Sequence, residues 1–178
     1  MSKIFEIPKD VKKIFKFILK TEDKTSLRYP FVYKKGDSLM ATDNYIAVRW
    51  GNCLLEDVPE GAYEIVKEGL LFAADLGAVD VPDVDVLTPE KVISESFEKV
   101  PSYYLAKIGF IYPFNKKFFK FMEYLVDVKR QYPCYEMRAT EKEPSQGKGI
   151  YPIVYIAFCH HGVKSPIWEF WFTGLEDG

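Results

Sequence analysis

Hydrophobic residues recur at helical spacing in two segments of the chain. In residues 9–20 they stand at positions i, i+3, i+4, i+7 and i+8, and they are Val11, Ile14, Phe15, Ile18 and Leu19. In residues 115–131 the apolar face consists of Phe118, Phe121, Met122 and Leu125. This spacing places each set on one side of a helix. The pattern therefore predicts two amphipathic helices, with Asp10 and Asn115 as caps or first-turn acceptors shortly after a proline.

Aromatic and β-branched runs predict strands around both helices. Three follow the first helix, at residues 27–35, 38–50 and 62–66, and three follow the second, at 133–140, 150–160 and 165–173. Short apolar runs, 3–7 and 107–112, precede the two helices. Each half is thus expected to follow the order strand, helix, strand, strand, strand. Residues 69–76 are expected to form a short helix between the halves.

These elements predict an α+β fold in a single domain over residues 1–178. Its two β-α-β-β-β halves, about residues 1–76 and 107–178, are connected by residues 77–106, and antiparallel sheets carry the two helices on one side. Hydrophobic residues make up 48% of the 178 residues and charged residues 28%, which excludes a disordered or fibrous chain.

Charge is distributed unevenly. The chain has 24 basic and 26 acidic residues, a net charge of −2. Residues 9–20 contain five lysines against Asp10, and residues 115–131 contain five basic residues against Glu123 and Asp127. The rest of the chain is therefore strongly acidic, and the basic charge is concentrated on the two predicted helices.

The run Ser38–Val48, which includes Ala41-Thr42-Asp43, resembles the strand and turn of bacterial DNA sliding clamps, the β subunit of the replicative polymerase. Residues 59–65 resemble the clamp strand that follows. The likeness covers about residues 1–76 at the level of motifs, and the second half matches by its order of elements. In that family each domain has two β-α-β-β-β halves, and six domains close into a ring whose helices line a central hole.

The resemblance implies a non-catalytic accessory protein of replication or repair that contacts duplex DNA without reading its sequence. Flexible basic side chains on phosphates suffice for such contact. Bacterial clamps carry three domains per chain and this chain has room for one, so a homo-oligomeric ring would need six copies. A replication protein is a further expected partner. The candidate DNA-facing residues are Lys9, Lys12, Lys13, Lys16, Lys20, Lys116, Lys117, Lys120 and Arg130.

Other interpretations of the same residues stay open. The lysines are equally a solvated helix face. The same fold could serve as a protein-interaction module that does not bind DNA, with the aromatic run Ile167–Phe172 as an exposed edge or as ordinary core. A hydrolase using His160 or His161 with a carboxylate is the remaining hypothesis.

The other polar motifs indicate no enzyme, cofactor or metal. Asp43 is expected in a hairpin turn, bonded to local backbone. Cys159-His160-His161 has no second Cys or His pair at ligand spacing, and the acidic run 80–85 lacks the glycine and terminal glutamate of a calcium loop. Neither a phosphate-binding glycine loop nor a nucleophile elbow is recognisable.

Cysteine usage and hydropathy predict a cytoplasmic protein. Three cysteines at wide spacing, Cys53, Cys134 and Cys159, argue for reduced thiols instead of a disulfide framework. The N-terminus lacks a secretion signal. The longest apolar stretch, Ile150–Cys159, is shorter than a membrane span requires.

Overall fold

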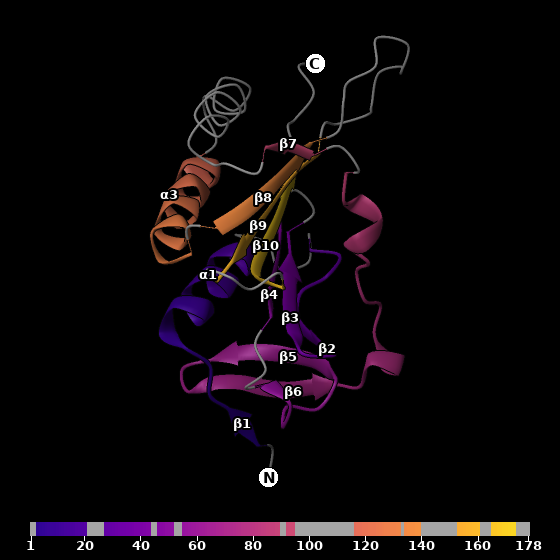
Figure 1. The fold of residues 1–178 in the computed structure, drawn as a ribbon. Coiled ribbons are helices and arrows are strands. Elements are labelled where there is room, and N and C mark those ends of the chain that lie inside the picture. The colour runs from indigo at the N-terminus through magenta and orange to yellow at the C-terminus, as the bar shows by residue number, and fades with distance from the viewer. Residues whose placement is uncertain are drawn as a thin grey trace. The chain divides into compact units, whose positions relative to one another are not determined.

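The chain folds into two compact units, residues 1–84 and 85–178. The computed structural model describes residues 3–20, 27–43, 46–51, 55–89, 92–94, 116–132, 134–139, 153–160 and 165–173. In the described part each unit combines one α-helix with antiparallel strands (Figure 1). The α+β class expected from the sequence is confirmed.

Unit 1 contains six described strands in the order β1-β6-β5-β2-β3-β4. Tyr33 in β2 lies opposite Met40 in β3 and Ala62 in β5, so β2 is central among these strands. The strand bounds are β1 (Ile4–Phe5), β2 (Val32–Lys35), β3 (Ser38–Thr42), β4 (Ile46–Gly51), β5 (Gly61–Val66) and β6 (Gly69–Ala74).

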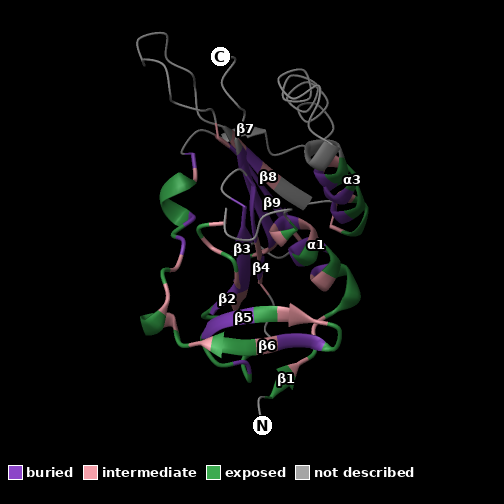
Figure 2. Ribbon diagram, turned by 180° about the vertical axis from the view of Figure 1, so that it is seen from behind, coloured by how far each residue is buried: buried purple, intermediate pink, exposed green. Residues whose placement is uncertain are grey.

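The first predicted helix is confirmed as α1 (Lys9–Leu19). Pro8 occupies the N-cap position without a side-chain cap, and Asp10 lies in the first turn, where its charge suits the helix N-terminus. The helix ends where Lys20 becomes extended and its N–H bonds the Phe17 carbonyl at 3.3 Å. The apolar face packs against β3 and β4, with Phe15 and Ile18 fully buried (Figure 2).

The expected short helix at residues 69–76 is wrong, because this run forms β6 and a 3₁₀ turn at Leu76–Ala78 follows it. A turn at Lys67 and Glu68 folds β6 back onto β5, and β6 also pairs with β1. Gly69 allows the backbone of β1 to lie close to the start of β6. Its φ is +147°, and a Cβ there would lie 2.1 Å from the Phe5 carbonyl oxygen. In the described part of unit 1 five strands therefore follow α1 instead of three, since residues 38–50 also split into β3 and β4.

In unit 2, α3 and the three strands after it follow the expected order, and β7 lies within residues 77–106, which were expected to be a connection. Its sheet has the strand order β10-β9-β8-β7, and Phe121 of α3 packs on Phe170 and Phe172 of β10. The predicted strand at 107–112 and the predicted cap Asn115 lie outside the described residues. The bounds are a 3₁₀ turn (Asp85–Leu87), β7 (Val92–Ser94), α3 (Lys116–Gln131), β8 (Cys134–Ala139), β9 (Ile153–Cys159) and β10 (Pro166–Thr173).

The aromatic run at the end of the chain is core. Trp168, Phe170 and Phe172 alternate along β10 and are buried, as is Trp171 on the other face. The Phe170 ring lies 5.6 Å from Trp168 and 5.9 Å from Phe158 of β9. Each aromatic side chain removed from water contributes about 2 kcal/mol or more to stability. These buried residues form part of the hydrophobic core of unit 2 and do not form an exposed edge.

Candidate nucleic-acid interface

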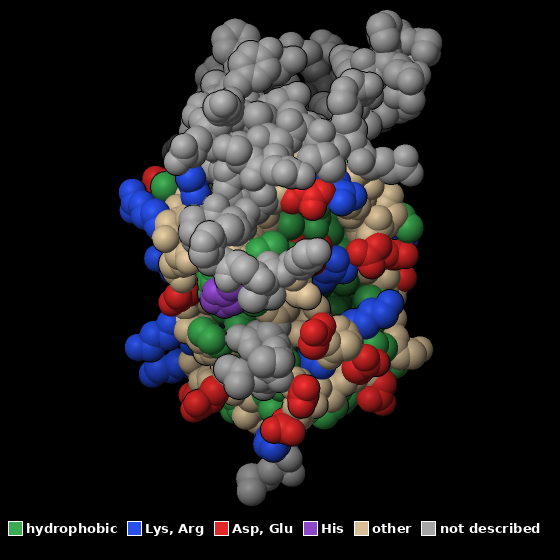
Figure 3. All heavy atoms as spheres, viewed as in Figure 1, with side chains coloured by type: hydrophobic (Ala, Val, Ile, Leu, Met, Phe, Trp, Pro, Cys, Tyr) green, Lys and Arg blue, Asp and Glu red, His purple; other side chains and the backbone are tan. Residues whose placement is uncertain are grey.

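The outer face of α1 is a continuous row of lysines. The buried apolar face takes up positions 11, 14, 15 and 18, so the lysines fall on the opposite side of the helix. Four of them are exposed, and Asp10 is the acidic residue of the helix. Blue side chains project from the α1 side of unit 1 in Figure 3. We call this surface the α1 basic face; it consists of Lys9, Lys12, Lys13, Lys16 and Lys20.

Lys12 is the half-buried member of this face and ties α1 to the sheet. Its Nζ donates a hydrogen bond of 2.6 Å to the carbonyl oxygen of Lys67, in the β5–β6 turn. Lys67 itself is exposed, so the turn brings another cation beside the α1 basic face. Lys67 was not among the predicted DNA-facing residues, because its place depends on the β5–β6 hairpin, which was not expected.

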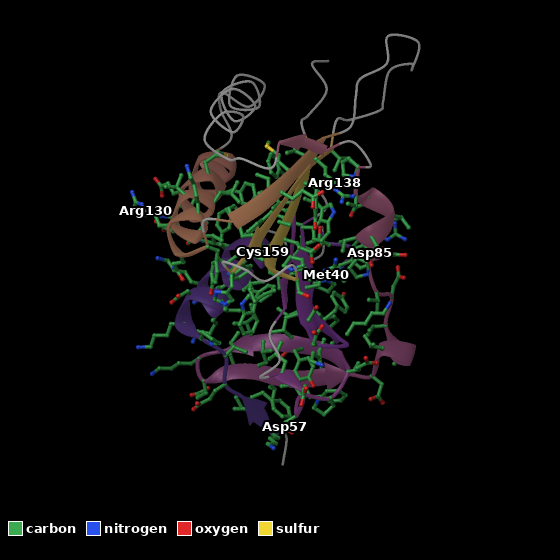
Figure 4. The ribbon with its side chains drawn as sticks, viewed as in Figure 1. Met40, Asp57, Asp85, Arg130, Arg138 and Cys159 are labelled. Carbon is green, nitrogen blue, oxygen red and sulfur yellow. The ribbon has the colours of Figure 1, made fainter. Side chains whose placement is uncertain are left out.

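Two basic groups of α3 are paired with carboxylates of the same helix. Lys120 Nζ lies 3.0 Å from Glu123 Oε2, and Arg130 Nη1 lies 3.8 Å from Asp127 Oδ1. The hydrogen bond to Glu123 raises the pKa of Lys120. All four side chains are well exposed, and Arg130 projects away from α3 in Figure 4. Exposed pairs of this kind are weak and remain available to a stronger anion.

The remaining predicted groups on α3 are Lys116 and Lys117. Both belong to the first turn of α3, and their side chains lie outside the described residues. In its described part α3 thus presents cations beside carboxylates, whereas α1 presents a run of cations with one carboxylate. Of the two helices, α1 has the surface that better matches a phosphate backbone.

A polar row on the sheet of unit 2 was not anticipated. Arg138 and Tyr155 are directly opposed in β8 and β9, and Tyr155 and Trp171 in β9 and β10. On this face Tyr155 Oη donates to Glu169 Oε2 at 2.5 Å, and Trp171 Nε1 donates to Thr88 Oγ1 at 2.9 Å. Arg138 Nε contacts Glu136 Oε1 at 2.5 Å. The alternation of polar residues in the strand sequences is the signal that could have predicted it.

This polar row is a satisfied network. Tyr155 and Glu169 are buried and bonded to each other, and no buried side-chain nitrogen or oxygen in the described part of the chain lacks a partner. Buried polar groups with all partners in place stabilise and specify a sheet. The hydrogen bonds of this row therefore stabilise the sheet of unit 2.

Asp43 has the turn role expected from the sequence. Its Oδ1 accepts the Ile46 N–H at 2.7 Å, and its own N–H donates to the Ile46 carbonyl at 3.1 Å. The Thr42 hydroxyl bonds the same carbonyl at 3.0 Å. The Ala41-Thr42-Asp43 motif thus closes the β3–β4 hairpin.

The other polar motifs assemble no metal site in the described residues. Asp80, Asp83 and Asp85 are exposed, as expected for a solvated loop, and Asp80 forms an ion pair of 3.5 Å with Arg28. His160 is exposed, with its ring 4.8 Å from the Tyr132 ring. His161 lies outside the described residues, so the hydrolase hypothesis stays untested. Among the described helices none is long and apolar enough to cross a membrane.

No protein-family model, curated protein or solved structure matches this chain.

Proposed function

We propose that this protein is a non-catalytic, clamp-like accessory factor of DNA replication or repair that contacts duplex DNA through the α1 basic face. The observation that carries the proposal is the charge of this surface. Four lysines occupy the outer side of α1 and Lys20 follows its last residue, in a protein whose net charge is −2. Such a surface attracts phosphates locally, while the acidic remainder repels nucleic acid elsewhere.

The α1 basic face suits binding that does not read sequence. Lysine ammonium groups are flexible point charges that neutralise phosphates without contacting base edges. Each neutralised phosphate releases counterions, so affinity depends steeply on salt and little on sequence. Residues 9–20 span about 16 Å at 1.5 Å per residue, long enough to lie along several phosphates.

The clamp-like fold rests on three features. Unit 2 has the order β-α-β-β-β in its described part, each helix covers a face of its own sheet, and Ala41-Thr42-Asp43 closes a hairpin. Unit 1 departs from the clamp half by the additional hairpin that β6 forms with β5. A ring of several copies would place α3 beside DNA as well, and the placement of both helices on one side is part of this proposal.

A charge-reversal pair tests the proposal on the full chain. Lys16 and Lys35 are both exposed residues of unit 1, but Lys16 lies on α1 and Lys35 at the β2–β3 turn. We expect Lys16→Glu to weaken duplex binding about tenfold at 0.1 M salt and to reduce the salt slope by about 1. Lys35→Glu changes the net charge equally and should leave the slope unchanged. Fluorescence anisotropy with a labelled duplex measures both.

Equal loss of affinity in the two variants would show that net charge acts instead of the α1 basic face. Absence of duplex binding by the folded wild-type protein would remove the proposal. It would leave the protein-interaction module, which one feature favours: Met122 and Val126 of α3 line a shallow hollow with Glu123, Asp127 and Arg130.

A further inference from the structure

Two cysteines far apart in the sequence are directly opposed in the sheet of unit 2. Cys134 is the first residue of β8 and Cys159 the last of β9, and the two are partners in the antiparallel register. Partners of this kind share one face of a sheet. The wide spacing of the three cysteines in the sequence had argued against a disulfide framework.

The distance between opposed residues fits a disulfide. Directly opposed residues in antiparallel strands have Cα atoms about 4.5 to 5.5 Å apart. Disulfides join residues whose Cα atoms are about 4.4 to 6.8 Å apart. The backbone register of β8 and β9 at this pair is therefore compatible with a disulfide.

The surroundings support contact between the two chain segments at this end of the sheet. The Tyr132 ring, just before β8, lies 4.8 Å from the ring of His160, just after β9. On the other side of β9, Cys159 faces Pro166, where the β9–β10 register shifts. Cys159 is partly exposed. A thiol at an irregular, partly open sheet end is accessible to small reagents.

We propose that Cys134 and Cys159 form a reversible disulfide by exchange with a small-molecule disulfide such as glutathione disulfide. One protein thiolate attacks the reagent, forms a mixed disulfide and displaces one glutathione thiolate. The second protein thiolate then attacks the protein sulfur of that mixed disulfide and displaces the second glutathione. Two electrons and two protons pass from the protein to two molecules of glutathione, so the exchange is balanced.

The bond would fix the point where the chain leaves α3 and enters the sheet. Cys134 lies two residues after Tyr132, whose N–H donates to the Val128 carbonyl of α3 at 2.9 Å. The disulfide also closes the connection from β8 to β9 into a covalent loop. A closed loop restricts the unfolded chain, so oxidation is expected to stabilise unit 2.

The test uses the full chain, equilibrated in a buffer of reduced and oxidised glutathione and then trapped with a maleimide. We expect oxidised protein that has not been treated with maleimide to be about 2 Da lighter than the reduced protein, the mass of two hydrogens. Peptide mapping should join the segment with Cys134 to the segment with Cys159. The midpoint of thermal unfolding should rise by about 5 °C or more and return after reduction with dithiothreitol.

Single substitutions provide the controls. Cys53→Ser removes the third cysteine and should retain the mass loss, whereas Cys134→Ser and Cys159→Ser should abolish it. A cross-link that includes Cys53, a lasting mixed disulfide with glutathione, a disulfide between two chains, or fully alkylated thiols in the wild-type protein would each overturn the proposal. Mapping of the wild-type protein decides the question even where a serine variant fails to fold.

Discussion

At the residue scale, Tyr33 shows how burial in unit 1 opposes the ionisation of a side chain. It lies in the central strand β2 with 1% of its surface exposed. The rings of Tyr29 and Phe31 stand edge-to-face to it at 6.3 and 6.2 Å. Burial raises the pKa of Tyr33 to about 12, and the negative charge of Asp80 adds to the effect. The folded protein therefore keeps this hydroxyl protonated above the pH at which an unfolded chain would lose the proton.

The stability of the protein should depend on pH through Tyr33. The pKa of Tyr33 rises from 10.0 in the unfolded chain to about 12 in the folded protein. Its contribution to the free energy of unfolding is therefore complete below pH 10. It is lost as the pH rises from 10 to 12, since the unfolded chain then releases the proton first. Urea unfolding of the wild type and of Tyr33→Phe between pH 9 and 11.5 measures this. The free energy of unfolding of Tyr33→Phe should fall less with rising pH than that of the wild type. Parallel pH curves for the two proteins would contradict the raised pKa of Tyr33.

At the element scale, two cations of α3, Lys120 and Arg130, are paired with carboxylates of the same helix. If α3 also meets DNA, as proposed, Glu123→Gln with Asp127→Asn should free Lys120 and Arg130 for phosphates. We expect about fivefold tighter duplex binding and a salt slope steeper by about 1. The matched control is Asp57→Asn with Glu64→Gln, which removes two exposed carboxylates from unit 1. An equal gain in both variants would show a general charge effect and exclude a role for α3.

Element boundaries were predictable where local residues decide them. The spacing of apolar residues predicted both helices. Asp43 could be assigned to a turn because its side chain bonds a backbone group only three residues away. β6 could not be predicted, because its conformation depends on Phe5 and Ile65 and its own residues include good helix formers. The position of Lys67 and the pairing of Cys134 with Cys159 depend on the same kind of remote contact.

At the scale of the whole molecule, encirclement of DNA requires more than one copy of this chain. If each copy provides one clamp-like domain, as proposed, we expect light scattering to give a native mass of about six subunits. Closed symmetry of identical subunits is the common route to such assemblies. A monomer at all concentrations would rule out encirclement and leave contact through the α1 basic face on one side of the duplex.

The most direct measurement is the salt dependence of binding to two duplexes of unrelated sequence. If the five lysines of the α1 basic face neutralise phosphates, the logarithm of the binding constant should fall linearly with the logarithm of salt concentration. We expect a slope of about −3 to −4.5, at about 0.9 per phosphate, and equal affinity for both duplexes within a factor of about two. A slope near zero, or an affinity that differs more than about tenfold between the duplexes, would contradict backbone contact by α1.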